Sequence, residues 1–268
     1  MKTYDKCNII GDTHGLTLWK DLVIDDAVNV FVGDYFSPHR FIPYEDVEKN
    51  FLEIIEYKKK HPQTVLLIGN HDEDHWHICE IYQRHHFEHR TEIQQLFEAN
   101  KDLFQMAYSF KNQILVTHAG VSKGWYESRI VGDNLEEEDR LKLTPDKVAE
   151  EINRVWHEDP RVNFSYATNR KMSDYGAYSS LQSPIWIRFS ALKDFNLFAG
   201  MPHIQVFGHT MVESIESYCD GYNVFKGNLY DVDCLETTRE SLLIEIGKDR
   251  VRHVYHYQVA DPPPADQL

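Results

Sequence analysis

Five short apolar segments of this chain each run directly into a glycine-containing polar motif, and this pattern restricts the folds open to it. In chain order the motifs are GDTHG at 11–15, GDYF at 33–36, GNHD at 69–72, THAG at 117–120 and GHT at 208–210. The segments before them are rich in Val, Ile, Leu and Phe, as buried strands are. Helix-like sequence separates several of them, so we predict an α/β fold with the polar motifs at strand ends.

The sequence between the motifs indicates where helices begin and end. An apolar stripe of helical spacing over 44–60 predicts a helix that stops before Pro62. Thr144 and Pro145 are the residue types of an N-cap and a first helical residue, so a second helix is predicted to begin there.

The whole of 1–258 is interpreted as a single domain. The long stretches 73–113 and 121–200 read as mostly helical or irregular insertions that cap the site. Residues 229–246 alternate as antiparallel strands that close a sheet do. The last segment, 259–268, is predicted to be a disordered tail.

Charge and cysteine usage exclude several classes of protein. The 268 residues include 28 Lys and Arg against 43 Asp and Glu, a net charge of −15, which is the wrong sign for a general nucleic-acid binder. No apolar stretch is long enough to span a membrane, and the start of the chain has no signal-peptide pattern. The four cysteines form no CxxC pair, so we expect a cytoplasmic, reducing location.

The strand-end motifs offer oxygen and imidazole donors and no thiolate. The candidates are Asp12, His14, Asp34, Asn70, His71, His118 and His209. Such donors suit Mn²⁺, Fe or Zn²⁺ better than copper or an iron–sulfur cluster. Asp12 and His14 are two residues apart, so in an extended segment both side chains leave the same face. A carboxylate such as that of Asp34 can bridge two ions.

The five motifs, in this order, resemble those of the calcineurin-like metallophosphoesterase superfamily from Asn8 to about Thr210. The opening GDTHG and the final GHT are similar to the branch that holds protein serine/threonine phosphatases and diadenosine-tetraphosphate hydrolases. Met211 stands where many other members carry a second histidine. The resemblance implies a four-layer α/β/β/α sandwich with helical or irregular cap insertions.

The resemblance also implies a dinuclear metal centre. Asp12 and His14 would bind the first ion, Asp34 would bridge both, and Asn70, His118 and His209 would complete the second site. The two divalent ions are expected to be Mn, with Fe, Zn or Co left open. A metal-bridging water or hydroxide would attack phosphorus directly, and His71 would protonate the leaving oxygen as general acid.

Two positions depart from the branch's second motif. Ser37 stands where the branch has an aspartate that orients the acid histidine, and Pro38 where it has a phosphate-binding arginine. Arg40 could reach the phosphate from a shifted position, and Asp72 or Asp74 could support His71.

A further arginine completes the substrate-binding set. Arg188, in the segment PIWIR, resembles the family's other arginine. We therefore predict that Asn70, Arg40 and Arg188 contact a phosphorylated substrate, which could be a phosphoprotein, a nucleotide or a small phosphoester.

A phosphomonoesterase of the serine/threonine phosphatase type is the preferred interpretation. A nucleotide pyrophosphatase or phosphodiesterase is the alternative, and a scaffold that kept the fold but lost catalysis is a third. All six metal positions keep ligand-type residues and His71 is retained, which favours an enzyme.

Other unusual features are interpreted as structural. The histidine-rich stretch 71–89 could be a lid or an extra metal site, but apart from His71 its imidazoles are interpreted as solvated. Trp186 is interpreted as a packing residue, and Asp233 and Cys234 as part of sheet packing.

Overall fold

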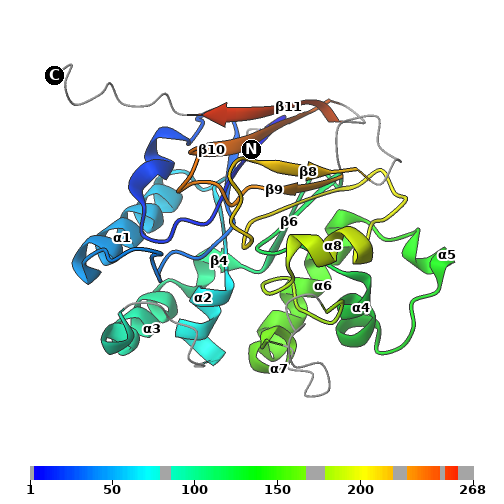
Figure 1. Ribbon diagram of the computed structural model, residues 1–268, viewed down its shortest axis with the longest axis horizontal. Coiled ribbons are helices and arrows are strands. Elements are labelled where there is room, and N and C mark those ends of the chain that lie inside the picture. Colours follow the sequence, from blue (N-terminus) through cyan, green and yellow to red (C-terminus); the bar gives the residue numbers. More distant parts are fainter. Residues whose placement is uncertain (1–2, 79–85, 167–178, 220–227, 248–250, 259–268) are drawn as a thin grey trace.

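Two β-sheets lie face to face between two layers of helices in the computed structural model (Figure 1), as the sequence predicted. The structure describes residues 3–78, 86–166, 179–219, 228–247 and 251–258. The predicted tail, 259–268, lies outside the described residues. None of the helices in these ranges has the length and apolar character that crossing a membrane requires.

The first sheet has its parallel strands on one side and an antiparallel hairpin on the other. Its strand order is β11 (Val251–Gln258), β10 (Glu240–Ile246), β1 (Lys6–Ile10), β2 (Val28–Phe31), β3 (Val65–Leu67) and β4 (Phe104–Gln105). Strands β1 to β4 are parallel, with Ile9 opposite Val30, and β10 pairs antiparallel with β1 and β11.

The second sheet is parallel at its centre and antiparallel at its edges. Its strand order is β5 (Ala107–Phe110), β6 (Ile114–Thr117), β7 (Ile204–Phe207), β9 (Leu229–Asp231) and β8 (Glu216–Tyr218). Strands β6, β7 and β9 run parallel, so the carboxyl ends of all three lie at the same edge of the sheet. The expectation that 229–246 forms antiparallel closing strands is therefore correct for β10 and for the pairing of β9 with β8, but wrong for the pairing of β9 with β7.

The cores explain the continuous apolar runs before the motifs. Side chains of both sheets, including Ile9, Val30, Val116 and Val206, form a buried cluster between the layers. On the outer face of the first sheet, Phe31 packs in a second cluster with the helix α1 (Tyr44–Lys60). Because central strands are buried on both faces, they carry no polar alternation.

Helix α1 (Tyr44–Lys60) has the predicted bounds, and α6 (Pro145–Glu158) begins where Thr144 and Pro145 predicted. The Thr144 hydroxyl accepts a hydrogen bond from the Lys147 N–H at 3.4 Å. Helix α6 covers β5 and β6 of the second sheet, on the far side of the molecule from α1 (Figure 1).

The remaining helical elements are short, and several lie in the two predicted insertions. They are a 3-10 turn at Thr17–Asp21, α2 (Asn70–Glu73), a π-turn at Asp74–Ile78, a 3-10 turn at Phe87–His89, α3 (Arg90–Ala99), a 3-10 turn at Lys101–Leu103, α4 (Lys123–Tyr126), a π-turn at Glu127–Val131, α5 (Glu137–Arg140), α7 (Pro160–Phe164) and α8 (Phe189–Phe195). The stretch 73–113 is more than a cap, because it also contributes edge strands β4 and β5.

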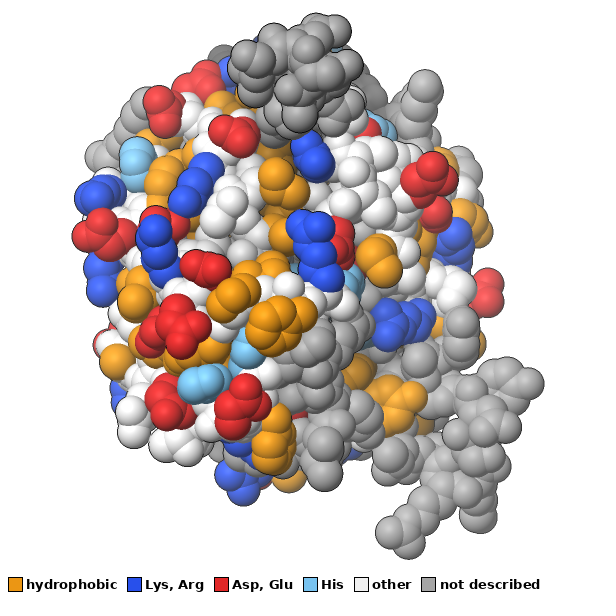
Figure 2. All heavy atoms as spheres, turned by 60° about the vertical axis from the view of Figure 1, so that its left-hand side comes forward, with side chains coloured by type: hydrophobic (Ala, Val, Ile, Leu, Met, Phe, Trp, Pro, Cys, Tyr) orange, Lys and Arg blue, Asp and Glu red, His pale blue; other side chains and the backbone are white. Residues whose placement is uncertain are grey.

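The surface over α1 carries charges of both signs. Figure 2 brings this side of the molecule forward and shows acidic, basic and hydrophobic side chains intermixed on it. Ion pairs such as Lys20–Glu53, at 2.6 Å, join neighbouring segments there. Exposed pairs of this kind contribute at most about 1 kcal/mol each.

Candidate metal centre

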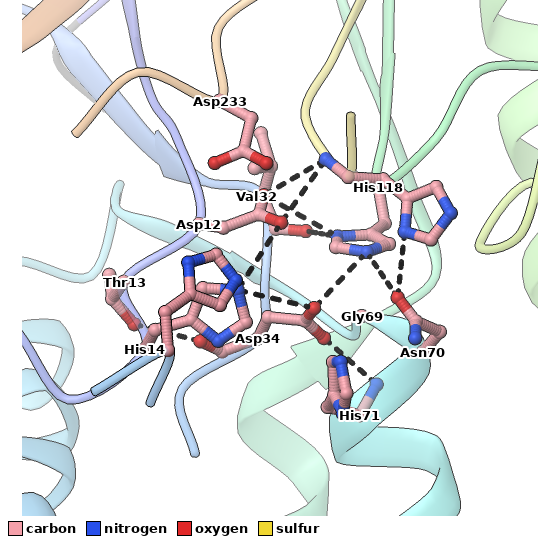
Figure 3. Close-up of polar contacts among 12 residues, drawn as sticks. Asp12, Thr13, His14, Val32, Asp34, Gly69, Asn70, His71, His118 and Asp233 are labelled. Atoms are coloured by element: carbon pink, nitrogen blue, oxygen red, sulfur yellow. Dashed lines mark hydrogen bonds and ion pairs between the residues drawn. The ribbon is translucent and has the colours of Figure 1, made fainter. Parts of the chain in front are cut away.

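The predicted ligand residues come together at the edge where the parallel strands of both sheets end (Figure 3). Asp12 and His14 follow β1, and Asp34 follows β2. Asn70 opens α2 after β3, while His118 and His209 follow β6 and β7. The strand-end pattern of the sequence therefore becomes one cluster in space, and all six side chains are buried or nearly so.

Asp12, His14 and Asp34 form the first group of donors. The His14 ring places Nδ1 3.1 Å from the Phe36 carbonyl oxygen, so Nδ1 donates and Nε2 keeps its lone pair. Nε2 lies 3.9 Å from Asp12 Oδ2 and 3.8 Å from Asp34 Oδ2. Two ligands about 2.0–2.2 Å from one ion are at most about 4.4 Å apart, so His14 can share a cation with either carboxylate. Asp12 and Asp34 also offer oxygens that lie, together with a ring nitrogen of His118, within 4.8 Å of one another.

Asp34, Asn70, His118 and His209 form the second group. The His118 Nδ1–H donates to the Val32 carbonyl at 2.9 Å, which leaves a lone pair on Nε2. That Nε2 lies 2.9 Å from Asn70 Oδ1, another acceptor, and 3.6 Å from Asp34 Oδ2. His209 Nδ1 lies 2.8 Å from the same Asn70 oxygen. Facing lone pairs repel each other unless a cation lies among them, so these residues fit a divalent metal.

The two groups share one atom, Asp34 Oδ2. Burial by itself would raise the pKa of Asp34, but the imidazoles of His118, His71, His14 and His209 outweigh it and lower the pKa. Its other oxygen, Oδ1, accepts the His71 backbone N–H at 2.9 Å. An ionised carboxylate held at one oxygen and shared at the other has the geometry of a bridge between two ions.

Burial disfavours the charged form of two of the histidine donors, His118 and His209. Burial lowers the pKa of His118, and it lowers that of His209 well below the usual value, with the charge of Arg188 adding to the effect. A neutral imidazole has a nitrogen lone pair available for a metal. Burial raises the pKa of Asp12, and the carboxylates of Asp233 and Asp34 raise it further. A cation would relieve this crowding of negative charge.

The backbone is strained at three of the candidate ligands. His14, Asp34 and His209 have φ angles of +43°, +53° and +69°, in the left-handed region that side chains other than glycine disfavour. Such residues cost about 1–3 kcal/mol each and persist where the surrounding structure holds them. Each of these three residues lies in a turn that directs its side chain into the cluster.

Glycine is required beside the carboxylates for a steric reason. A Cβ at Gly208 would overlap Asp12 Oδ1 and lie 2.9 Å from Val32 Cγ2. We expect Gly208→Ala to displace Asp12 and weaken Mn²⁺ binding about 10- to 100-fold, the range seen when a ligand's support is disturbed. The measurement is the rise in Tm on adding Mn²⁺, compared with each protein's own Tm in chelator. An unchanged Mn²⁺-dependent rise would contradict this role of Gly208.

The cluster forms the floor of a cavity of about 290 Å³. Arg188, a predicted substrate-binding residue, and His71, the predicted general acid, both line it. The Arg188 Nη1 donates to the His209 carbonyl at 2.7 Å, which fixes the guanidinium over the cavity. His71 Nδ1 is buried and has no hydrogen-bond partner among the described residues.

Four lining residues were not assigned to the site from the sequence: His39, Trp186, Met211 and Asp233. His39 packs its ring 4.2 Å from that of His14 and hydrogen-bonds Glu236 through Nδ1 at 2.9 Å. Asp233, interpreted from the sequence as part of sheet packing, also lines the cavity, whereas Cys234 lies in the core between the sheets. The adjacent Asp233 and Cys234, before the closing strands, were the sequence feature that could have drawn attention to Asp233.

The structure does not bring Arg40 or the Asp72 carboxylate to the reacting groups. The Arg40 side chain is 71% exposed and lies 3.8 Å from Glu236, away from the cavity lining. The Asp72 carboxylate accepts hydrogen bonds from the backbone N–H groups of Asp34, Tyr35 and Gly69, at 2.7, 2.9 and 3.0 Å. It thus fixes the loops that carry the ligands, rather than the His71 ring.

The histidines of 71–89 are mostly packed, so their interpretation as solvated side chains is wrong for the residues described. His75 is buried, its Nε2 lies 3.2 Å from Ser37 Oγ, and burial lowers its pKa to about 3. His77 pairs with the buried Glu73 at 2.8 Å, and His89 stacks on a tyrosine of α1. His86 Nε2 hydrogen-bonds a backbone carbonyl, and His85 lies outside the described residues. Asp74, the other proposed support of His71, is buried beside these residues.

Comparison with known proteins agrees with this geometry. The family model for calcineurin-like phosphoesterases matches residues 6–213. A cold-active protein-tyrosine phosphatase from a psychrophilic Shewanella species has 17% identity and a TM-score of 0.50, over 96% of this chain and 81% of that one. A protein serine/threonine phosphatase from Saccharomyces cerevisiae has 14% identity and a TM-score of 0.52, over 98% and 82%. At these identities the two structures establish a shared fold. No curated protein sequence gives a significant match.

Proposed function

Because this chain belongs to the calcineurin-like phosphoesterase family and is a metal-dependent phosphoesterase, we propose that it hydrolyses phosphomonoesters. The observation that carries the proposal is Asp34 Oδ2, which lies between His14 Nε2 and His118 Nε2 at 3.8 and 3.6 Å. One carboxylate oxygen facing two sets of metal-binding side chains is the arrangement that a pair of divalent ions needs.

Asp12, His14 and Asp34 would hold one ion, and Asp34, Asn70, His118 and His209 the other. When bound, the ions lower the pKa of a coordinated water toward neutrality and offset the negative charge of the phosphate oxygens. We propose Mn²⁺ as the native pair, because oxygen donors outnumber imidazoles in the first group.

The chain's own side chains would bind and orient the phosphate. The Arg188 guanidinium is planar and presents several N–H donors, which suits paired hydrogen bonds to phosphate oxygens. Its anchor on the His209 carbonyl ties the phosphate position to a metal-ligand loop. His71, held through its backbone N–H by Asp34, would give its ring proton to the leaving oxygen.

Cavity size favours a compact substrate group. At about 290 Å³ the cavity is slightly smaller than typical small-molecule sites, which span roughly 300–1,000 Å³. A phosphomonoester needs only its phosphate and the adjacent carbon inside. A nucleotide pyrophosphatase or phosphodiesterase is the second candidate, favoured by Trp186 on the cavity wall, since an indole can stack on a base.

Metal removal tests the proposal. We expect dialysis against EDTA to lower turnover of p-nitrophenyl phosphate more than about 100-fold, and added Mn²⁺ to restore it, because the ions supply the water activation. Circular dichroism before and after chelation controls for unfolding. Metal analysis that finds no bound ion, together with no stimulation by Mn²⁺, would remove the catalytic interpretation.

A substrate panel with Mn²⁺ present separates the two candidates. It includes phosphopeptides, mononucleotides, dinucleoside polyphosphates and bis-p-nitrophenyl phosphate. The proposal predicts the highest kcat/KM on monoesters. Higher values on diesters or dinucleoside polyphosphates would favour the second candidate.

A further inference from the structure

Asp233 lies at the same sheet edge as the metal ligands, two residues beyond the end of β9. The backbone N–H of Val232 donates to the Phe207 carbonyl at 2.8 Å, and the Val212 N–H donates to the Asp233 carbonyl at 3.0 Å. These bonds attach the Val232–Asp233 segment on both sides of the loop that presents His209. Asp233 is therefore placed by the sheet rather than by a free surface loop.

A close backbone approach brings Asp233 next to Asp12. A Cβ at Gly11 would overlap the Val232 carbonyl oxygen and lie 3.3 Å from Asp233 Cα. Only glycine lets the two segments pack this tightly. The Asp233 side chain is 5% exposed, lines the same cavity as Asp12 and His14, and lies beside Asp12 in Figure 3.

The close approach of the two segments gathers acidic side chains around the cavity. Asp12, Asp34 and Asp233 are 3%, 1% and 5% exposed, and all three line the same cavity. Three buried carboxylates around one cavity supply the oxygen donors that a hard divalent cation prefers. The second group already has four protein donors, whereas the first has only three.

We propose that Asp233 is a fourth protein ligand of the first metal site, an inference that rests on the proposed function. The first ion would then be held by three carboxylates and one imidazole, and the second by one carboxylate, one amide and two imidazoles. More carboxylate and less nitrogen favours a harder ion. The first site would thus prefer Mn²⁺, while the second would accept Zn²⁺ more readily.

Metal binding of the purified full chain tests this ligand. Wild type, Asp233→Asn, Asp233→His and Asp194→Asn are dialysed against graded Mn²⁺, and bound metal is measured by mass spectrometry. Asp194 is an exposed residue of α8, so its variant controls for the loss of one negative charge. We expect Asp233→Asn to keep one ion and weaken the other at least tenfold, and Asp194→Asn to match wild type.

Asp233→His separates coordination from charge alone. It removes the same charge as Asp233→Asn but supplies an imidazole, so we expect it to bind the second equivalent more tightly than Asp233→Asn and to prefer Zn²⁺ over Mn²⁺ more than wild type does. Circular dichroism measures whether each variant is folded. If Asp233→Asn does not fold, the comparison is made between Asp233→His and wild type.

Either of two outcomes overturns the inference. One is two Mn²⁺ ions bound to folded Asp233→Asn with wild-type dissociation constants. The other is an Asp233→His protein that binds no better than Asp233→Asn. If wild type itself binds no metal, the proposed function fails instead. If wild type binds two ions and hydrolyses phosphoesters while the Asp233 variants match it, only the assignment of Asp233 fails.

Discussion

Asp34→Asn is expected to abolish nearly all turnover and to release both metal ions. Asp34 Oδ2 is the one atom shared by the two donor groups, so its loss weakens both sites together. An amide is a weaker, uncharged ligand, and it no longer offsets two divalent charges. Losing about 4 kcal/mol of transition-state stabilisation corresponds to a fall of about 10³ in kcat.

The fold should survive this substitution, so the result can be interpreted. Asp34 Oδ1 accepts the His71 backbone N–H at 2.9 Å, and an asparagine oxygen can accept the same bond. The left-handed backbone at Asp34, with φ of +53°, is also one that asparagine tolerates. Bound Mn²⁺ and kcat on p-nitrophenyl phosphate are measured side by side, with Asp194→Asn as the charge-matched control. Wild-type turnover in Asp34→Asn would refute the bridging role.

The sequence could predict which residues form the donor cluster because each of them is tied to a local pattern. His14, Asp34, Asn70, His118 and His209 all lie within glycine motifs directly after apolar strands, and parallel strands end at a common edge. The periodicity of the apolar residues therefore predicted the strands, and the residue types in the motifs that follow predicted metal binding. The family and the two-sheet sandwich are confirmed on the same basis.

The residues that were missed depend on contacts between distant segments. Asp233 reaches the site only because Gly11 admits the Val232 backbone, and His39 because its ring packs on His14. Neither contact leaves a periodic signal along the chain. Arg40 shows the opposite case: it is a suitable residue type near a motif, but its exposed side chain lies beside Glu236.

Edge strands were missed for a different reason. Strands β4 and β5 have two and four residues, and no glycine motif follows either. Short apolar segments of this kind cannot be told from helix by periodicity alone. Their pairing is set by the sheet that they extend, which is a tertiary contact.

His71→Asn is expected to lower kcat on alkyl phosphate esters by about 10²–10⁴, the usual contribution of a positioned general acid. An alkoxide leaves poorly without a proton, whereas nitrophenolate needs little help, so we expect a fall of less than about tenfold on p-nitrophenyl phosphate. Bound metal should stay at the wild-type level, because the His71 ring belongs to neither donor group. This separates it from Asp34→Asn, which loses metal and activity on both substrates.

The contacts of His71 allow the leaving-group test to distinguish proton donation from structural support. Within the part of the chain that the structure describes, neither Ser37 nor Asp72 hydrogen-bonds the His71 ring: Ser37 contacts His75, and Asp72 binds three backbone amides. The ring packs edge-on to that of His14, with centroids 5.7 Å apart, so it is fixed by packing and by its own backbone bond to Asp34. His253→Asn, on the exposed strand β11, is the matched control. Equal losses on the two substrates would show that His71 supports the site without donating the proton.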